Sequence, residues 1–223
     1  MTLSDMLGDV NVVLLDFDGP VCDVYAGYPA TEVARRVIDA LAIEDPDDVT
    51  DPLEILRRAE GRSGQPAAMR ADDILKAAEL DAVQSSRPTP GATEVLTACR
   101  RAGVPVAIVS NNSEPAIRRY LSLHRLDQLV DGVAGRPHGR PDRMKPHPYL
   151  LDQAVSNLRA SRDEVVLIGD SATDVEAAMR ADFRVIGYAN KPGKELHLRQ
   201  GGAALVVHSM REVAAALATR TLL

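Results

Sequence analysis

A chain of 223 residues that is 45% hydrophobic is long enough to bury a sizeable core, as one large domain or as a domain with a smaller insert. The formal net charge of −6 and the aromatic content of 3% argue against a nucleic-acid-binding protein, which needs a basic surface and rings on which bases stack. The chain has no run of about 18 apolar residues, and its acidic start, MTLSDMLGDVN, is unlike a signal peptide, so we expect a cytoplasmic protein that contacts no membrane.

The first predicted element is a strand, Val10–Leu15, whose continuous apolar residues are typical of a parallel strand buried on both faces. Residues 21–87 then have helical spacing and no strand pattern. Two capping signals are present: Thr31 is expected to cap one helix, and Asp51 followed by Pro52 another. The helices predicted there cover residues 31–42, 51–61 with its end at Gly61, and 67–83.

Strands alternate with helices after a turn-rich boundary at residues 85–91. Strands are predicted over residues 104–110, 163–170, 183–189 and 204–208, and helices over 91–103, 113–124, 172–182 and 209–218. This alternation is typical of a parallel sheet in a doubly wound domain. We therefore predict an α/β protein with a Rossmann-like parallel-sheet core, residues 1–20 and 88–223, and an inserted α-helical cap, residues 21–87.

Polar side chains follow three of the predicted strands at the point where each strand ends. They are Asp16 and Asp18 after the first strand, residues 110–112 after the second, and Asp170, with Asp174 close behind, after a later one. In an open parallel sheet, ligands bind beyond the carboxyl ends of the strands. Carboxylates gathered there without a cation would repel one another and raise their own pKa values. A magnesium ion, Mg²⁺, which prefers oxygen ligands, would remove this repulsion.

Lys145 lies in a loop between strands and adds a positive charge to this group. A metal ion, a lysine, a hydroxyl and backbone N–H groups at a helix start together suit a phosphate dianion. Asp16 at a strand end is placed to attack phosphorus. Asp18, two residues later, points to the same side in an extended chain and is placed to protonate the leaving oxygen and then to activate water.

The motifs DFDGP, VSNN, MKPHP and GDSATD, in this order, resemble the four motifs of the haloacid dehalogenase superfamily, in particular its phosphoglycolate phosphatase-like members with a helical cap. The resemblance covers residues 10–20 and 88–190, and the helical insert lies where this superfamily places its smaller cap. It implies that Asp16 is the nucleophile and a Mg²⁺ ligand. It also implies that Asp18 is the general acid and base and offers its backbone carbonyl to the metal.

The resemblance assigns the remaining roles to residues after the other strands. Ser110 and the backbone of Asn111 would hold the phosphoryl oxygens, and Lys145 would neutralise the nucleophile and the phosphate. Asp170 would bind Mg²⁺, and Asp174 would hold a metal-bound water or Lys145.

An acid at the position of Asp18 favours cleavage of a phosphomonoester, because an alkoxide leaving group needs a proton whereas a halide does not. Pro20 departs from the Thr or Val that is common at its position, and it removes a backbone N–H. We therefore predict a Mg²⁺-dependent phosphatase that acts on a small phosphorylated metabolite through an aspartyl-phosphate, as a monomer or homodimer. Specificity is expected in cap residues 44–70.

Two other functions use the same fold. A β-phosphoglucomutase-like phosphotransferase would need the same two acids, so the core motifs do not separate it from a phosphatase. A non-catalytic regulatory protein would keep the fold without the reaction.

The segment GRPHGRPDRMKPH, residues 135–147, is unusually basic. It contains Arg136, Arg140, Arg143, Lys145 and two histidines against one acid. A hydrated loop is the favoured interpretation of such a segment. The alternative is a basic rim that attracts an anionic substrate.

Overall fold

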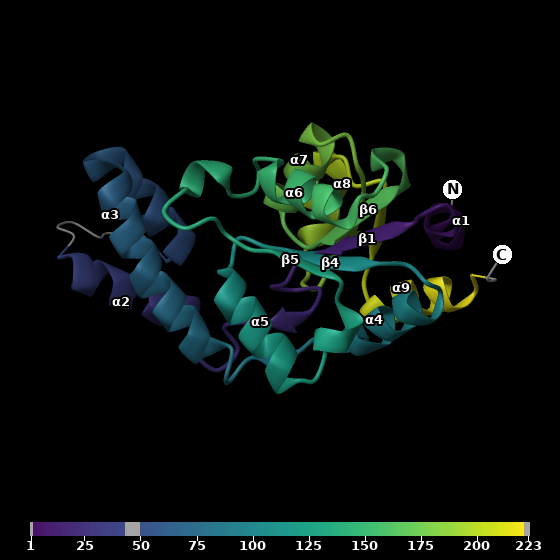
Figure 1. The fold of residues 1–223 in the computed structure, drawn as a ribbon, viewed down its shortest axis with the longest axis horizontal. Helices are drawn as coiled ribbons and strands as arrows, with labels where there is room; N and C mark the ends of the chain where they lie inside the picture. Colours follow the sequence, from purple (N-terminus) through teal and green to yellow (C-terminus); the bar gives the residue numbers. More distant parts are fainter. Residues whose placement is uncertain (1, 43–49, 221–223) are drawn as a thin grey trace.

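The computed structural model describes residues 2–42 and 50–220. Its centre is a parallel sheet of six strands in the order β5-β4-β1-β6-β7-β8, with helices on both faces (Figure 1). The strands are β1 (Val12–Leu15), β4 (Val106–Val109), β5 (Gly132–Ala134), β6 (Val165–Gly169), β7 (Arg184–Tyr188) and β8 (Leu205–Val207). In the central pairings, Leu14 lies opposite Ala107 on one side and Leu167 on the other. The predicted α/β, Rossmann-like core is confirmed.

Alternate residues of the central strands face opposite sides of the sheet, and both sides are covered. Val13 and Leu15 belong to one apolar cluster, and Val12 and Leu14 belong to another. Every residue of β1, β4 and β6 is buried, which explains their continuous apolar sequences. The first cluster includes residues of α1 (Leu3–Gly8), α4 (Ala92–Arg101), α5 (Glu114–Leu123) and α9 (Met210–Ala218), and the second those of α6 (Tyr149–Leu158), α7 (Ala172–Arg180) and α8 (Lys194–Gly201).

The insert consists mainly of α2 (Ala30–Leu41) and the long α3 (Pro52–Ala82), which lie beside one end of the sheet (Figure 1). The chain leaves and rejoins the core through an antiparallel pair of two-residue strands, β2 (Cys22–Asp23) and β3 (Arg87–Pro88). The prediction that residues 21–87 contain no strand is therefore wrong. Strands of two residues are too short to show an alternating pattern in the sequence. Core packing also extends into this segment, because Val21 and Val83 belong to the first apolar cluster.

Helix ends in the insert were predicted with mixed success. Asp51 does cap α3, because its Oδ1 accepts a hydrogen bond of 2.9 Å from Leu53 N. Thr31 is not the cap of α2, which begins one residue earlier with Pro29 at the N-cap position and no side-chain cap. The expected end at Gly61 is also wrong, since α3 continues to Ala82 with a break at Gly64, where φ is 72°.

Several elements were not predicted. The six-residue α1, the three-residue β5 and the polar α8 are too short or too weakly apolar to give a clear periodic signal. The candidate specificity segment 44–70 is only partly visible, because residues 44–49 lie outside the described residues. No helix in residues 2–42 and 50–220 has the length and apolar character needed to cross a membrane.

Candidate active site

The three strands that end in polar residues are neighbours in the sheet. β1 lies between β4 and β6, so the residues that follow them meet at one edge. A cavity of about 360 Å³ lies at this edge. Its lining includes six of the seven predicted site residues, Asp16, Asp18, Ser110, Asn111, Lys145 and Asp170. The seventh, Asp174, is fully buried and contacts Lys145.

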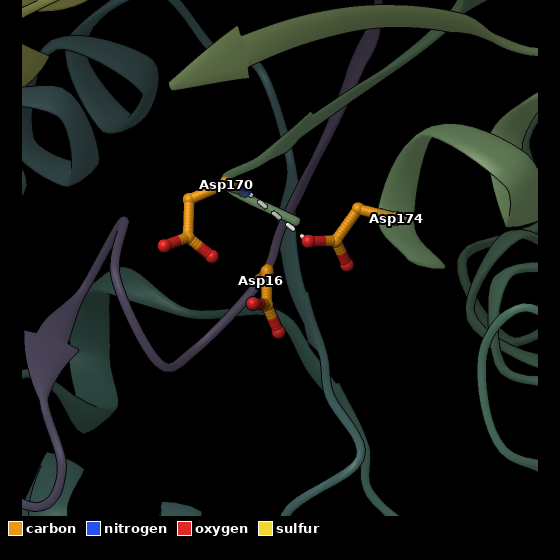
Figure 2. A group of neighbouring side chains, drawn as sticks. All are labelled: Asp16, Asp170 and Asp174. Atoms are coloured by element: carbon orange, nitrogen blue, oxygen red, sulfur yellow. Dashed lines mark hydrogen bonds between the residues drawn. The ribbon is translucent and has the colours of Figure 1, made fainter. Parts of the chain in front are cut away.

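Three carboxyl groups converge at the ends of β1, β6 and the first turn of α7 (Figure 2). One oxygen each from Asp16, Asp170 and Asp174 lies within 4.8 Å of the others. The cap of α7 fixes Asp174: its Oδ2 accepts hydrogen bonds from Ser171 N at 3.0 Å and Asp170 N at 3.2 Å. Because Oδ2 is used in this way, Oδ1 is the oxygen that remains for Lys145.

Lys145 is a buried cation that contacts two of the three acids. Its Nζ donates to Asp16 Oδ1 at 2.7 Å, Asp174 Oδ1 at 2.5 Å and the carbonyl oxygen of Val109 at 3.0 Å. Burial by itself lowers the pKa of Lys145, but Asp16 and Asp174 outweigh it and raise that pKa, so the ammonium stays charged. Lys145 therefore holds the predicted nucleophile in place.

One buried lysine does not balance three buried carboxyl groups. Burial raises the pKa of Asp16 to about 8, Asp174 adds to this effect, and Lys145 opposes it. Burial also raises the pKa of Asp170, against the effect of Lys194. The carboxyl oxygens lie close together, and the positive charge around them does not balance their negative charge. They therefore fit a hard divalent cation such as Mg²⁺.

Asp170 has two partners that were not predicted. Asn190 Nδ2 donates to its Oδ2 at 2.8 Å, and Lys194 Nζ contacts the same oxygen. Both belong to the segment NKPGK, residues 190–194, which follows β7. The only sequence signal was its position after a core strand, which does not say that its side chains turn back toward Asp170.

Asp18 lines the same cavity as Asp16, while the intervening Phe17 is fully buried in the core. Burial raises the pKa of Asp18 to about 6, with Val24 N–H, which donates to Oδ1 at 3.0 Å, opposing the rise. A carboxyl group with this pKa can exist in both protonation states near neutral pH, as a general acid and base requires.

The turn after Asp18 explains Gly19 and accommodates Pro20. Gly19 has a φ of 108°, and a Cβ there would lie 2.5 Å from Asp170 Cγ, so only glycine fits. Three backbone hydrogen bonds close the turn. Gly19 N donates to Cys22 O, and the N–H groups of Val21 and Cys22 both donate to Phe17 O. They flank Pro20, so the missing N–H of the proline costs the turn no hydrogen bond.

The loop after β4 is tied to the segment that carries Lys145. Asn111 Nδ2 donates to Lys145 O at 3.0 Å, and Asn111 Oδ1 accepts from Lys145 N at 2.8 Å. Ser110 Oγ donates to Asn112 Oδ1 at 3.1 Å and accepts from Asn112 N at 3.2 Å. The sequence indicated a role for the backbone of Asn111, whereas its side chain also holds the backbone of Lys145.

The basic segment 135–147 is not simply a hydrated loop. Arg136 is only 5% exposed, so the favoured interpretation is wrong for this residue. Met144 is also buried and packs among apolar residues of α2 and α3. Nothing in the local sequence showed this, because the acids that pair with Arg136 lie 57 and 64 residues away in the chain.

Known proteins are similar to this chain in sequence or in fold. The chain is 27% identical to the N-acetylmuramic acid 6-phosphate phosphatase of Pseudomonas aeruginosa, over 92% of this chain and 93% of the relative. It is 29% identical to a plasmid-encoded phosphoglycolate phosphatase of Cupriavidus necator, over 95% and 82% of the two chains. The crystal structure of a predicted phosphatase from Clostridium acetobutylicum has the same fold, with a TM-score of 0.75, 19% identity and coverage of 92% of this chain and 97% of that one.

A family match covers most of the chain. Residues 10–182, which include β1, the insert and the strands up to β6, match the family described as haloacid dehalogenase-like hydrolase. This range contains all seven predicted site residues. The chain therefore belongs to the haloacid dehalogenase-like hydrolases.

Proposed function

We propose that this hydrolase is a Mg²⁺-dependent phosphatase that cleaves a small phosphomonoester through an aspartyl-phosphate on Asp16. The observation that carries the proposal is the group of three buried carboxyl groups around Lys145 at the carboxyl ends of adjacent strands. The names of the relatives support it, since the two described above are phosphatases of phosphorylated small molecules.

The metal would be held by the carboxylates of Asp16 and Asp170 and the backbone carbonyl of Asp18, with Asp174 nearby. When bound, Mg²⁺ supplies positive charge that neutralises the acids and the phosphoryl oxygens. The hydrogen bond from Lys145 Nζ to Asp174 Oδ1 supports a role of Asp174 in holding that lysine.

The residues of the chain divide the reaction between them. Lys145 holds Asp16 at 2.7 Å, and Ser110 Oγ with the N–H of Asn111 would bind phosphoryl oxygens. Asp16 attacks phosphorus, so that a bond forms between its carboxylate oxygen and phosphorus while the ester P–O bond breaks. Asp18 gives its proton to the leaving oxygen.

The second half of the reaction reverses the roles of Asp18. As a carboxylate it takes a proton from water, whose oxygen attacks phosphorus and breaks the bond to Asp16, releasing inorganic phosphate and the free carboxylate. The pKa of about 6 suits both halves, because neither protonation state of Asp18 is strongly disfavoured near neutral pH.

The leaving group would lie toward the cap. Tyr25, Ala30 and residues 50–53, all from the insert, line the same cavity as the site residues. A cavity of about 360 Å³ suits a small metabolite rather than a folded protein. We propose that these cap residues select the substrate.

A panel of phosphomonoesters, assayed for phosphate release with and without Mg²⁺, tests the proposal. We expect turnover of at least one small substrate only with the metal, and a loss of at least about a thousandfold in Asp16→Asn. The conservative change Asp163→Asn, at an exposed residue, is the control. Turnover that persists in Asp16→Asn contradicts the mechanism, and no turnover across the panel contradicts the activity. Conversion of β-glucose 1-phosphate to glucose 6-phosphate in place of hydrolysis would identify a phosphotransferase.

A further inference from the structure

A second buried ionic cluster joins the cap to the core. Arg136, from the segment after β5, lies between Asp72 and Glu79 of α3. Its Nε and Nη2 donate to Asp72 Oδ1 at 2.9 and 2.7 Å, and its Nη1 donates to Glu79 Oε1 at 2.8 Å. Asp72 and Glu79 are seven residues apart, about two helical turns, so they lie on the same face of α3. We call these residues the cap–core cluster.

The cap–core cluster is shielded from water and well paired. The side chain of Arg136 is 0% exposed, that of Asp72 is 3% exposed and that of Glu79 is 0% exposed. Asp72 Oδ2 accepts a further bond from Gly139 N at 2.7 Å. Burial opposes the charge of Arg136, but Glu79 and Asp72 more than compensate and raise its pKa. Arg136 is therefore charged, and every carboxyl oxygen of Asp72 and Glu79 accepts a hydrogen bond.

The cap–core cluster also contacts the loop that is proposed to bind phosphate. Glu79 Oε2 accepts from Ser113 N at 2.9 Å, and Glu79 Oε1 accepts from Asn112 Nδ2 at 3.3 Å. Arg136 Nη1 donates to the carbonyl oxygen of Asn111 at 2.7 Å, and Arg136 N donates to that of Asn112 at 2.8 Å. Glu79 of α3 thus makes direct polar contacts with residues 112 and 113, and Arg136 contacts residues 111 and 112, next to Ser110.

The segment between Arg136 and Lys145 follows α3 closely. At Gly139 a Cβ would lie 2.4 Å from Met69 Cγ, and Met144 is buried in the apolar cluster of α2 and α3. The next residue is Lys145, whose backbone Asn111 holds on both sides. Two parts of the site, the loop after β4 and Lys145, are therefore both attached to α3.

We propose that Arg136 and Glu79 are positioning residues, which hold the loop of residues 110–113 against the cap helix in the arrangement that binds phosphate. The position of α3 on the core then affects how tightly the loop binds phosphate. The proposal rests on the proposed function only in that phosphate is the group bound by this loop.

A purely structural role makes a different prediction from a positioning role. Buried ion pairs often contribute little net stability, because desolvation of the charges offsets their attraction. If the cap–core cluster only fastened the cap, Asp72 and Glu79 would be equivalent, since both pair with Arg136 from the same face of α3. They differ in their other partners: Glu79 also bonds to residues 112 and 113, whereas Asp72 bonds to Gly139 N.

The matched variants Asp72→Asn and Glu79→Gln use this difference. Each removes one buried charge opposite Arg136 with little change in volume. In Glu79→Gln the new NH₂ group meets donors of the loop, Ser113 N or Asn112 Nδ2. We expect Glu79→Gln to weaken the binding of inorganic phosphate about tenfold, and Asp72→Asn less than about threefold. The measurement is isothermal titration calorimetry with inorganic phosphate and Mg²⁺ on the full chain.

Amide hydrogen exchange gives a second readout that does not depend on turnover. Faster exchange at residues 111–113 is expected in Glu79→Gln and near-normal exchange there in Asp72→Asn. Equal phosphate affinities and equal exchange in the two variants overturn the proposal. If the wild-type chain hydrolyses none of the phosphoester panel but the two variants still differ in phosphate binding, the proposed function fails and the positioning role stands.

A third variant covers the case in which Glu79→Gln does not fold. The triple variant Arg136→Met, Asp72→Leu, Glu79→Leu removes the charged side chains of the cap–core cluster. Buried ionic clusters often tolerate such a change. It also removes the side-chain bonds to residues 111–113 and leaves the backbone bond from residue 136 N to Asn112 O. We expect this variant to lose phosphate affinity by at least about tenfold, and wild-type affinity would overturn the proposal.

Discussion

The protein contains two buried ionic clusters that differ in how far their charges are satisfied. In the cap–core cluster, one arginine and backbone or amide N–H groups supply a donor to every carboxylate oxygen of Asp72 and Glu79. In the active-site cluster, three carboxyl groups surround Lys145, and burial raises the pKa of Asp16 to about 8. In the described part of the chain, Asp16 Oδ2 and Asp170 Oδ1 accept no hydrogen bond.

The difference separates two uses of buried charge. A carboxylate whose oxygens are all occupied has nothing left for a ligand, so the cap–core cluster fixes the positions of other groups. Acids with free oxygens and raised pKa values are costly to the fold, and they are retained where a cation or substrate uses them. The two clusters should therefore respond in opposite ways to changes in metal, charge and shape.

Removal of the metal is expected to have the largest effect. Chelation should lower phosphatase turnover at least about a hundredfold, because the chemistry loses several kcal/mol of charge stabilisation. Mg²⁺ should raise the unfolding temperature, by an amount that grows with the logarithm of its concentration once that exceeds the dissociation constant. Both effects can be measured by recording turnover and unfolding temperature with chelator and again after Mg²⁺ is restored. Unchanged turnover with chelator would show that Lys145 and Lys194 neutralise the three acids without a metal.

Asp18→Asn should change stability in a pH-dependent way. Folding raises the pKa of Asp18 from 3.8 to about 6, so the folded state binds this proton more tightly than the unfolded state. The stabilising effect of that proton is complete below pH 3.8 and is lost as pH rises through about 6. At pH 8 the asparagine should therefore stabilise the metal-free protein, by about 1–3 kcal/mol, and by less at pH 5.

Urea unfolding at pH 5 and pH 8 measures this change, with Asp72→Asn as the contrast. Asp72 is held by Arg136 and Gly139 N, so its replacement should destabilise the fold by about 1–3 kcal/mol. Two variants that change stability in the same direction at pH 8 would contradict the distinction between the clusters.

Gly19→Ala tests how closely the turn approaches the metal site. The new Cβ would lie 2.5 Å from Asp170 Cγ, so Asp170 has to move and Mg²⁺ affinity should fall about tenfold. Gly103→Ala is the control, because Gly103 also has a positive φ, of 66°, but no atom within 4 Å of its Cβ position. Calorimetric titration with Mg²⁺ should separate the two variants. Equal Mg²⁺ affinities would mean that backbone strain alone, and not the contact with Asp170, matters.

The sequence revealed the active-site cluster better than the cap–core cluster, for a physical reason. Asp16, Ser110 and Asp170 each follow a strongly apolar strand, and parallel strands bring their carboxyl ends to one edge. Arg136 has no such local signal: its partners lie on a helix far away in the chain, and its basic neighbours suggested a hydrated loop. Long-range pairing of this kind depends on how the cap packs on the core, which periodicity does not encode.

The same limit applies to α8 and the segment before it. The polar sequence of residues 190–201 gave no helical signal, and the approach of Lys194 to Asp170 follows only from how α8 packs beside β7. The sequence therefore did not reveal that Lys194 lies beside one of the three acids.

Lys194→Ala should have the smallest effect of these changes. Whether it tightens or weakens Mg²⁺ binding is informative. The ammonium of Lys194 contacts Asp170 Oδ2 in the structure, so it competes with a metal ion for that carboxylate. Because the Lys194 side chain is 30% exposed, the pair is partly screened, and its loss should tighten Mg²⁺ binding only about two- to fivefold. Lys191→Ala, in the same segment and exposed, should change the affinity less. Titration calorimetry of both variants decides the point: weaker Mg²⁺ binding in Lys194→Ala would mean that Lys194 orients Asp170 for the metal rather than competing with it.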